Sequence, residues 1–367
     1  MQRLARLFIS AAVFTACLGS SIFCAPAPAL ANGYDVYASP LAWSPDGRYL
    51  AVAVGEAWPR GDVSEPGKLL LYTRDGRFAE LASGSVGSPS FSPDGEKLSV
   101  VLDGRYVDYF LPRKDEPDLA GMASQTIGGT PDILDLRWNM RPDDEQELYW
   151  TRGERFYGCA VYAGILATSA SPLSSPPPDS SVFAPVAAPD GSTLLCLMQG
   201  GLKGDPAYER VVRYNPADGS FTQLTKPQAR EWDYHESNVV FVDEDTILFQ
   251  RGGWGDWRLY RFELAEDKEY LEVADAQQPT LSTDARWLAF TRRDPQLKAQ
   301  AEYDWEVPPT VWLRDRERGA EWQVSAPGVE AEYPALSPDG SKLAWLQKGD
   351  DGTPEVMLRS RAALLLH

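Results

Sequence analysis

The sequence predicts an all-β fold, a seven-bladed β-propeller made of four-stranded antiparallel blades. Three observations lead to this prediction: a hairpin pattern that recurs along the chain, a spacing that suits one hairpin per blade, and strand-like runs after each hairpin. Each copy of the pattern has a strand, a tight turn and a second apolar strand. The copies span residues 41–54, 89–102, 185–198, 238–251, 279–292 and 334–347.

A Pro-Asp-Gly turn joins the two strands in four of these copies. In the first copy, Pro45 has a fixed φ that suits the second position of a type I turn, Asp46 suits the third, and Gly47 can take a positive φ at the fourth. Such a turn forms a three-residue hairpin loop. The copy at 279–292 has Ala285 in place of the glycine, so we expect a left-handed alanine, at a cost of about 1 kcal/mol, or another turn type.

The spacing of the turns predicts a seventh, degenerate copy. The gap from Ser44 to Ser92 is 48 residues, and the gap from Ser92 to Ala188 is 96, which is twice as long. A copy is therefore missing near residue 140. Residues 133–152 provide two strand-like runs on either side of an acidic turn that begins at Pro142.

Further strands follow the hairpins and complete the blades. We expect third strands at 68–73, 208–214, 257–263 and 310–314, and fourth strands at 78–82, 221–225 and 322–325. Four antiparallel strands in a unit of about 40–55 residues are typical of a propeller blade. A propeller must also join its ends. We expect Tyr34–Ser39 to form the outer strand of the last blade, with Ala362–Leu366 as the alternative.

This order of segments resembles the TolB-type propeller repeat. The resemblance is carried by the Ser-Pro-Asp-Gly turns, the apolar second strands and the fourth strands that end in Leu-Thr or a similar pair, and it covers nearly all of the chain after residue 31. It implies the fold rather than an activity, because such blades occur in binding proteins, peptidase accessory domains and lyases. TolB also has an α/β domain before its propeller. The first repeat here begins soon after residue 31, so we expect that domain to be absent.

The N-terminus has the pattern of a secretion signal. Arg3 and Arg6 precede a mostly apolar stretch, and Ala29-Leu30-Ala31 offers small residues for cleavage. We expect residues 1–31 to be a signal peptide, residues 32–367 to form the propeller, and the protein to be periplasmic or secreted. A membrane anchor and a lipoprotein acylated at Cys17 are the alternatives.

The charge of the chain limits its partners. The formal net charge is −18, and −20 without Arg3 and Arg6. Such an acidic chain repels phosphate backbones, so we expect no nucleic acid partner. Basic proteins or cations are possible partners, although an acidic surface can also serve solubility alone. No segment after residue 31 is long and apolar enough to span a bilayer. Cys159 and Cys196 remain after cleavage, and we expect buried thiols rather than a bridge.

The sequence offers no recognisable catalytic motif. His235 and His367 are the two histidines, which are too few for a typical zinc site without the terminus. No Gly-x-Ser-x-Gly elbow, phosphate-binding loop or dinucleotide fingerprint occurs. We therefore expect no cofactor, no metal and no catalytic residue. A pair of carboxylates remains the one enzymatic option.

Propeller topology gathers aromatic and acidic residues on one face of the disc. The loop that leads into strand one and the loop that joins strands two and three lie on the same face, opposite the hairpin turn. We call this the loop face. In blades five to seven it would carry a candidate binding site made of Trp232, Asp233, Tyr234, His235, Trp254, Asp256, Trp257, Tyr303, Asp304, Trp305, Glu330, Glu332 and Tyr333.

These residues predict a binding function. Aromatic rings offer large contact area to proteins and sugars, and carboxylates accept hydrogen bonds. We expect a non-enzymatic monomer that binds an envelope protein, a peptide or a glycan. One alternative is a hydrolase or lyase acting on polysaccharide or peptide. Another is a structural module with an inert face, whose aromatics pack under the loops. The enzyme would use carboxylates from the set Asp233, Asp256, Asp304, Glu330 and Glu332.

Overall fold

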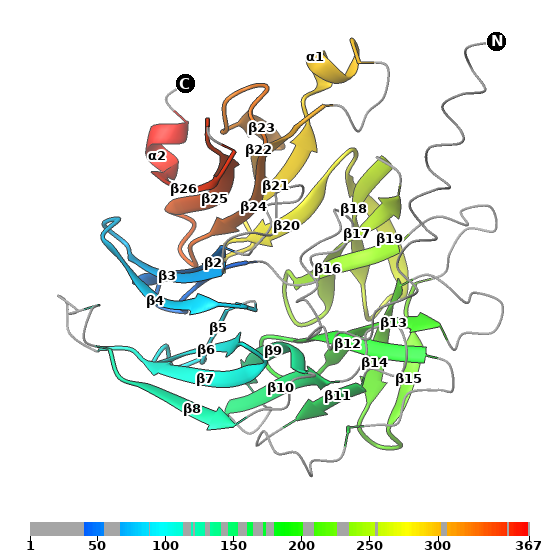
Figure 1. The fold of residues 1–367 in the computed structure, drawn as a ribbon. Coiled ribbons are helices and arrows are strands. Elements are labelled where there is room, and N and C mark those ends of the chain that lie inside the picture. The colour runs from blue at the N-terminus through cyan, green and yellow to red at the C-terminus, as the bar shows by residue number, and fades with distance from the viewer. Residues whose placement is uncertain are drawn as a thin grey trace, which may run out of the picture.

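The protein is an all-β propeller, as predicted, with antiparallel sheets arranged around a central axis (Figure 1). The computed structural model describes residues 40–54, 67–87, 89–112, 119, 122–128, 133–140, 146–152, 160–163, 172–173, 180–200, 209–225, 235–253, 256–301, 307–350 and 352–365. The predicted signal peptide, the segment Tyr34–Ser39 and Cys159 lie outside these residues. Cys196 is buried.

The described residues form seven antiparallel sheets, five with four strands and two with three. We call them blades one to seven in chain order. Blade one contains β1 (Leu41–Trp43), β2 (Tyr49–Val54), β3 (Gly67–Thr73) and β4 (Phe78–Gly84). Blade two contains β5 (Ser90–Phe91), β6 (Lys97–Leu102), β7 (Arg105–Phe110) and β8 (Ser124–Gly128). Blade three contains β9 (Ile133–Met140), β10 (Gln146–Arg152) and β11 (Ala160–Ala163).

The later blades follow the same order. Blade four contains β12 (Ser180–Ala187), β13 (Leu194–Gly200), β14 (Glu209–Asn215) and β15 (Ser220–Gln223). Blade five contains β16 (His235–Phe241), β17 (Thr246–Gly253), β18 (Asp256–Glu263) and β19 (Lys268–Val273). Blade six contains β20 (Gln277–Leu281), β21 (Trp287–Arg293), helix α1 (Pro295–Lys298), β22 (Pro309–Asp315) and β23 (Ala320–Gln323). Blade seven contains β24 (Ala331–Leu336), β25 (Lys342–Lys348) and β26 (Pro354–Ser360), followed by helix α2 (Arg361–Leu364).

The structure confirms some expectations and corrects others. The degenerate copy exists, because β9 and β10 pair antiparallel where the spacing predicted it. In the described residues, blades three and seven have three strands each, and the fourth strand expected for blade seven at Tyr34–Ser39 lies outside these residues. Ala362–Leu366 does not supply a closing strand, because the described part of this segment lies in α2 and the turn after it.

The hairpin turns have the predicted geometry. The Gly47 N–H donates to the Ser44 carbonyl at 2.8 Å, and Gly47 has a φ of +68°. The Ser44 hydroxyl donates to the Asp46 carboxylate at 2.7 Å and accepts the Tyr49 N–H at 2.9 Å, so side chains also brace the turn. Ala285 takes a φ of +53°, so the turn keeps its shape without glycine.

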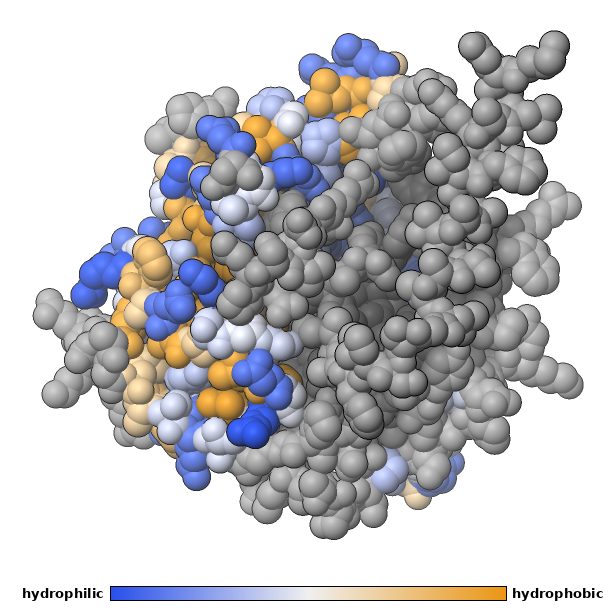
Figure 2. Space-filling model, viewed as in Figure 1, coloured by the Kyte–Doolittle hydropathy of each residue, from blue (hydrophilic) through white to orange (hydrophobic). Residues whose placement is uncertain are grey.

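The core lies between the blades. Leu69 and Leu71 of blade one pack in one cluster with Leu98 and Val100 of blade two. Apolar clusters also fill the contacts between blades four and five and between blades seven and one. We call each contact between neighbouring blades a seam. Over the described surface in Figure 2, hydrophobic and charged residues are interspersed. Among the described residues, the exposed large hydrophobic side chains are spread over four blades and are Phe78, Phe110, Tyr270, Leu271 and Leu297.

A β-bulge recurs in the innermost strands of blades four to seven. The pairing with the second strand shifts around one residue with positive φ in each, at Ala184, Asn238, Gln278 and Tyr333. A bulge of this kind bends the strand and leaves a residue unpaired. The same four positions therefore provide a common frame for comparing the blades.

Hydrogen bonds at these bulges join blades five, six and seven near the axis. The Gln250 side-chain oxygen accepts from the Asn238 side-chain amide and from the Gln278 backbone N–H, each at 2.8 Å. The Gln278 side-chain oxygen in turn accepts the Tyr333 backbone N–H at 2.9 Å. Each link satisfies a polar group that the bulge would otherwise leave unpaired.

Candidate functional site

The strand register places the described candidate residues at the loop-face end of their sheets. In blade five, His235 pairs with Gly252 and Trp257 also pairs with Gly252, so both lie where β17 ends and β18 begins. In blade seven, Ala331 pairs with Gln347 at the corresponding end of β24 and β25. The other candidates, Trp232, Asp233, Tyr234, Trp254, Tyr303, Asp304 and Trp305, lie outside the described residues.

His235 forms a link across the seam between blades four and five. Its Nδ1 contacts the carboxylate of Glu209, the first residue of β14. The Glu209 side chain is buried, whereas one third of the His235 side chain is exposed. When the imidazole is protonated, the pair is an ion pair with one buried member and one member that solvent can reach.

A second ionic group lies beside it, and two of its three members, Glu236 and Arg251, are buried. The Glu236 carboxylate accepts from Arg251 Nε and Nη2 at 2.9 and 2.8 Å. The same arginine donates to both oxygens of Glu269, at 2.6 and 2.7 Å. Desolvation opposes the charge of Arg251, but its two carboxylate partners raise the net pKa of the guanidinium. One cation is thus shared between two carboxylates of the same blade.

Glu236 also reaches into blade four. It accepts the backbone N–H of Val211 at 2.8 Å and the hydroxyl of Thr225 at 2.5 Å. A buried carboxylate needs several donors of this kind to offset its lost hydration. The buried acid therefore binds the first strand of blade five to the third strand of blade four.

Glu236 and its partners did not figure among the predicted site residues. A comparison of the repeats identifies Glu236 as unusual. It lies two residues before the left-handed Asn238. At the same distance before the other three bulges lie small or aliphatic residues, and they are buried. These residues are Val182, Ala276 and Ala331.

A second series of residues lies at or just before the start of the inner strands. His235, Asp275 and Glu330 each lie three residues before a bulge, in blades five, six and seven. Asp275 accepts from Lys298 of α1 at 3.0 Å, and Glu330 pairs with Lys348 at 3.4 Å. Each of these three positions thus presents a partly exposed ionisable group that a neighbour already holds.

The remaining described candidates have different surroundings. Asp256 forms a half-exposed ion pair with Arg258 at 2.8 Å, and Trp257 is half-buried in β18. Glu332 is half-buried in β24. Tyr333 packs against the apolar cluster between blades seven and one, and this burial, together with Glu332 and Glu330, raises the pKa of its hydroxyl well above the usual value.

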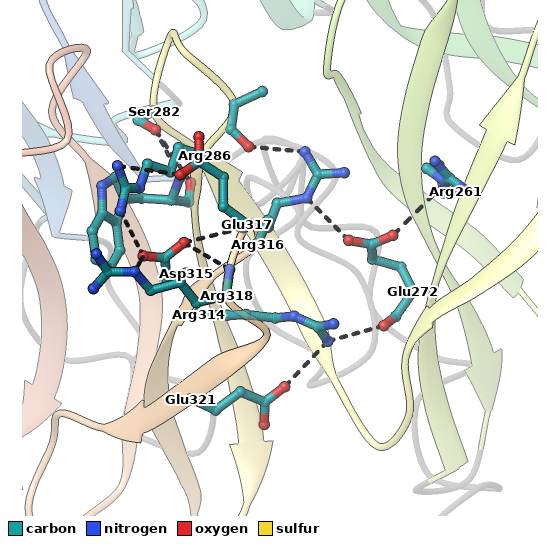
Figure 3. A network of polar contacts seen from close by, with 12 residues as sticks. Arg261, Glu272, Ser282, Arg286, Arg314, Asp315, Arg316, Glu317, Arg318 and Glu321 are labelled. Carbon is teal, nitrogen blue, oxygen red and sulfur yellow. Dashed lines mark hydrogen bonds and ion pairs between the residues drawn. The ribbon is translucent and has the colours of Figure 1, made fainter.

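An arginine-rich network occupies the seam between blades five and six (Figure 3). Arg316 Nε donates to the Glu272 carboxylate at 3.0 Å, and Arg314 Nη1 donates to the Glu272 carbonyl at 3.1 Å. Nearby, Arg286 forms an ion pair of 2.9 Å with the buried Asp315. Hydrogen bonding to Arg286 holds the pKa of Asp315 below its usual value, against the effect of desolvation. This network joins β19 to blade six.

The described residues contain neither a cluster suited to a metal ion nor a helix that could span a membrane. In the described ranges, no group of three or more His, Cys, Asp or Glu side chains could hold a metal ion. Within the same part of the chain, no helix has the length and apolar character needed to cross a bilayer.

Comparison with known proteins supports the fold. No family model matches the chain. An oligogalacturonate lyase solved in complex with manganese has a TM-score of 0.62 and 13% identity, over 90% of this chain and 90% of that one. The β-propeller domain of the Trilobed protease from Pyrococcus furiosus has a TM-score of 0.54 and 12% identity, over 87% and 95%. TolB from Acinetobacter baumannii aligns over 86% and 81%, with a TM-score of 0.46 and 14% identity.

One curated relative matches in sequence over a short stretch. Tricorn protease homolog 1 from Streptomyces coelicolor is 48% identical over 46 residues, which is 12% of this chain and 4% of that protein. The chain therefore spans a small fraction of the length of this relative. At these identities the solved structures are similar to the chain in fold alone. The chain is thus a β-propeller that is similar in fold to the oligogalacturonate lyase and to the propeller domain of the Trilobed protease.

Proposed function

We propose that this chain is a seven-bladed propeller of the TolB-type repeat that acts by binding rather than by catalysis. Its loop face in blades five to seven receives a partner, which is a protein, a peptide or a glycan. The seven sheets support the blade number. The Ser-Pro-Asp-Gly turns support the repeat type. The proposal also includes export to the periplasm or beyond, on the strength of the N-terminal sequence.

One observation carries the binding proposal. Three consecutive blades carry His235, Asp275 and Glu330 at equivalent positions on one face, each three residues before the bulge of the inner strand. Each side chain is held by a neighbour and is still partly exposed. Charged groups that are already in place lose less side-chain entropy when they bind a partner, so this arrangement suits recognition. Carboxylates that remain accessible accept hydrogen bonds from sugar hydroxyls or from peptide amines.

The test compares variants on arrays of purified glycans and synthetic peptides. Asp275→Asn with Glu330→Gln removes two charges from the loop face, whereas Glu317→Gln removes an exposed charge far from it, in the turn after β22. We expect the double variant to lose at least ten-fold in binding to the array members that wild type retains, and the control to bind as wild type does. Equal binding by all three proteins would contradict the proposal.

The same arrays separate binding from catalysis. A ligand that is recovered intact after prolonged incubation agrees with a binding protein. A glycan or peptide that is cleaved by wild type, and not by Asp256→Asn, would show the enzyme instead. Trp257→Ala tests the described aromatic of the face, with the exposed Phe78 as the matched site for a control alanine.

A further inference from the structure

Glu209 differs from the other groups that hold the ionisable residues of the loop face. Its carboxylate contacts Nδ1 of His235 from the neighbouring blade, and its side chain is 2% exposed. The partners of Asp275 and Glu330 are lysines that are 27% and 45% exposed, and each belongs to the same blade as the carboxylate that it holds. In this series of three, His235 is therefore the residue whose partner is both buried and supplied by another blade.

The strand register shows that Glu209 is also an exception among its counterparts. It pairs with Gln199 at the loop-face end of blade four. The corresponding rung of the sheet contains Trp257 in blade five and Pro309 in blade six. Neither of those two side chains can accept a hydrogen bond. The acid is thus present at the seam where the facing inner strand carries a histidine.

A second contact fixes the two strands that carry this pair. Glu236 follows His235 in β16 and accepts the N–H of Val211, which lies two residues after Glu209 in β14, at 2.8 Å. Both ends of this hydrogen bond are buried. The imidazole and the carboxylate are therefore held in place by their own backbones. A group that is already in its bound geometry loses less entropy when a partner arrives.

The contact through Nδ1 determines which atom of the imidazole meets a partner. An ionised carboxylate accepts hydrogen bonds and donates none, so Nδ1 carries a proton in the neutral ring as well as in the cation. The Glu209 side chain is buried, whereas one third of the His235 side chain is exposed. We infer that Glu209 is a positioning residue of the loop-face site, which turns the Nδ1 edge of His235 into the seam and so directs Nε2 to the partner. This inference rests on the proposed binding function and extends its site to blade four.

Nitrogen NMR of the imidazole tests the first step on the full chain. The chain contains two histidines, so His235→Ala identifies the signals of His235 and leaves those of His367 as the reference. We expect the neutral ring of His235 to carry its proton on Nδ1 in at least ten-fold excess, and this excess to be lost in Glu209→Met, which has no acceptor. A wild-type ring with its proton on Nε2, or a tautomer that Glu209→Met leaves unchanged, would overturn the inference.

Binding to the glycans and peptides that wild type retains on the arrays tests the second step. We expect Glu209→Met and His235→Ala each to weaken binding about ten-fold. The double variant should bind no more weakly than His235→Ala, because Glu209 acts through the imidazole. Thr225→Val is the control and should bind as wild type does, since it removes from the same seam a buried hydroxyl that donates to Glu236. Losses that add in the double variant, or an equal loss in the control, would show that Glu209 only stabilises the seam.

The outcomes separate this inference from the proposed function. If binding depends on Asp275 and Glu330 and is unchanged in His235→Ala, the proposed function stands and the inference fails. If wild type binds no array member, both fail.

A second variant serves if Glu209→Met does not fold. The amide of His235→Asn can donate to Glu209 but has no atom at the place of Nε2. We expect it to lose about ten-fold in binding with an unchanged midpoint in urea, and unchanged binding would overturn the inference.

Discussion

Blades five and six contain the same arrangement of an arginine, two aromatic rings and a glutamate, in two different environments. In each blade an arginine of the second strand lies over aromatic rings of the second and third strands and reaches a glutamate of the outer strand. In blade five, Arg251 lies 5.1 Å from the Phe249 ring and 4.7 Å from the Tyr260 ring, and binds Glu269. The counterparts in blade six are Arg292, Phe290, Trp312 and Glu321, with both ring distances at 5.0 Å.

The two blades differ at one inner-strand position. Blade five has Glu236 there and blade six has Ala276, and both residues are buried. The extra carboxylate gives Arg251 a second anionic partner, and the side chain of Arg251 is 5% exposed compared with 14% for that of Arg292. A single substitution in a repeated blade thus converts a local ion pair into a group that also holds the neighbouring blade.

A third seam shows how blades are joined without that acid. Between blades six and seven, the inner strand has Ala331, and the Val311 N–H donates to the Ser325 hydroxyl at 2.9 Å. The matching groups in the seam between blades four and five are Val211 and Thr225, which both donate to Glu236. A hydroxyl is therefore sufficient to satisfy this backbone donor, and the carboxylate adds a link to Arg251.

The largest effect is expected from removing the shared cation. Arg251→Met leaves two carboxylates without their counter-ion, one of them fully buried, so we expect a loss of about 3–5 kcal/mol in the free energy of unfolding. Arg292→Met breaks the matched pair in a more exposed place, and we expect about 1.5–3 kcal/mol. Urea denaturation of both variants measures the difference. Equal losses would contradict the distinction between the two blades.

A smaller effect is expected from removing the extra acid. Glu236→Ala recreates the arrangement of blade six, because Arg251 keeps Glu269 and the Val211 N–H can turn to the Thr225 hydroxyl. We expect a loss of about 1–3 kcal/mol, below that of Arg251→Met in the same urea titration. Glu317→Ala, at an exposed site, is the control and should change stability by less than about 0.5 kcal/mol. A loss as large as that of Arg251→Met would mean that blade four depends on this carboxylate alone.

The smallest effect is expected at the seam between blades seven and one, where the ion pair is exposed. Arg74 Nη2 donates to Asp339 at 2.5 Å and to the Ser341 hydroxyl at 2.6 Å. Partial burial acts to raise the pKa of Asp339, but hydrogen bonds from Arg74, Ser337 and Ser341 hold it well below the usual value. This contribution is therefore complete above the unfolded-state pKa of about 3.9 and is lost as the pH falls toward the folded-state pKa.

The measurement at this seam compares wild type with Asp339→Asn across pH. Because the pair is half-exposed, we expect a difference of less than about 1 kcal/mol at pH 7 that shrinks below about pH 4. A difference that grows in acid would have the wrong sign and would contradict the role given to Arg74. In that case the seam between blades seven and one would resemble the seam that contains the buried ionic group around Glu236.

Local rules predicted much of the fold. The Pro-Asp-Gly turns and the spacing of 48 and 96 residues located the hairpins, including the degenerate one, because turn chemistry acts within a few residues. The third strand expected at 257–263 is β18, with one residue added. The ionic contacts between blades could not be foreseen, since they depend on how distant parts of the chain meet.

For the candidate residues that the structure describes, the strand ends were predictable from sequence and the contacts were not. Topology put His235, Asp256 and Glu330 at the loop-face ends of their sheets. The partners Glu209, Lys298 and Lys348 could not be read from sequence, because they depend on seams and on side-chain direction. An alignment of the blades could have identified Glu236, because it is an acid at the position where the other blades have Val182, Ala276 and Ala331.

The amide links near the axis have a mechanical consequence. The Gln278 backbone donates toward blade five while its side chain accepts from blade seven, so it serves both neighbours at once. Removing any one of these three blades would leave an amide or a carbonyl group of a neighbouring blade without its partner. Under force or heat, we therefore expect blades five, six and seven to unfold together in a single step.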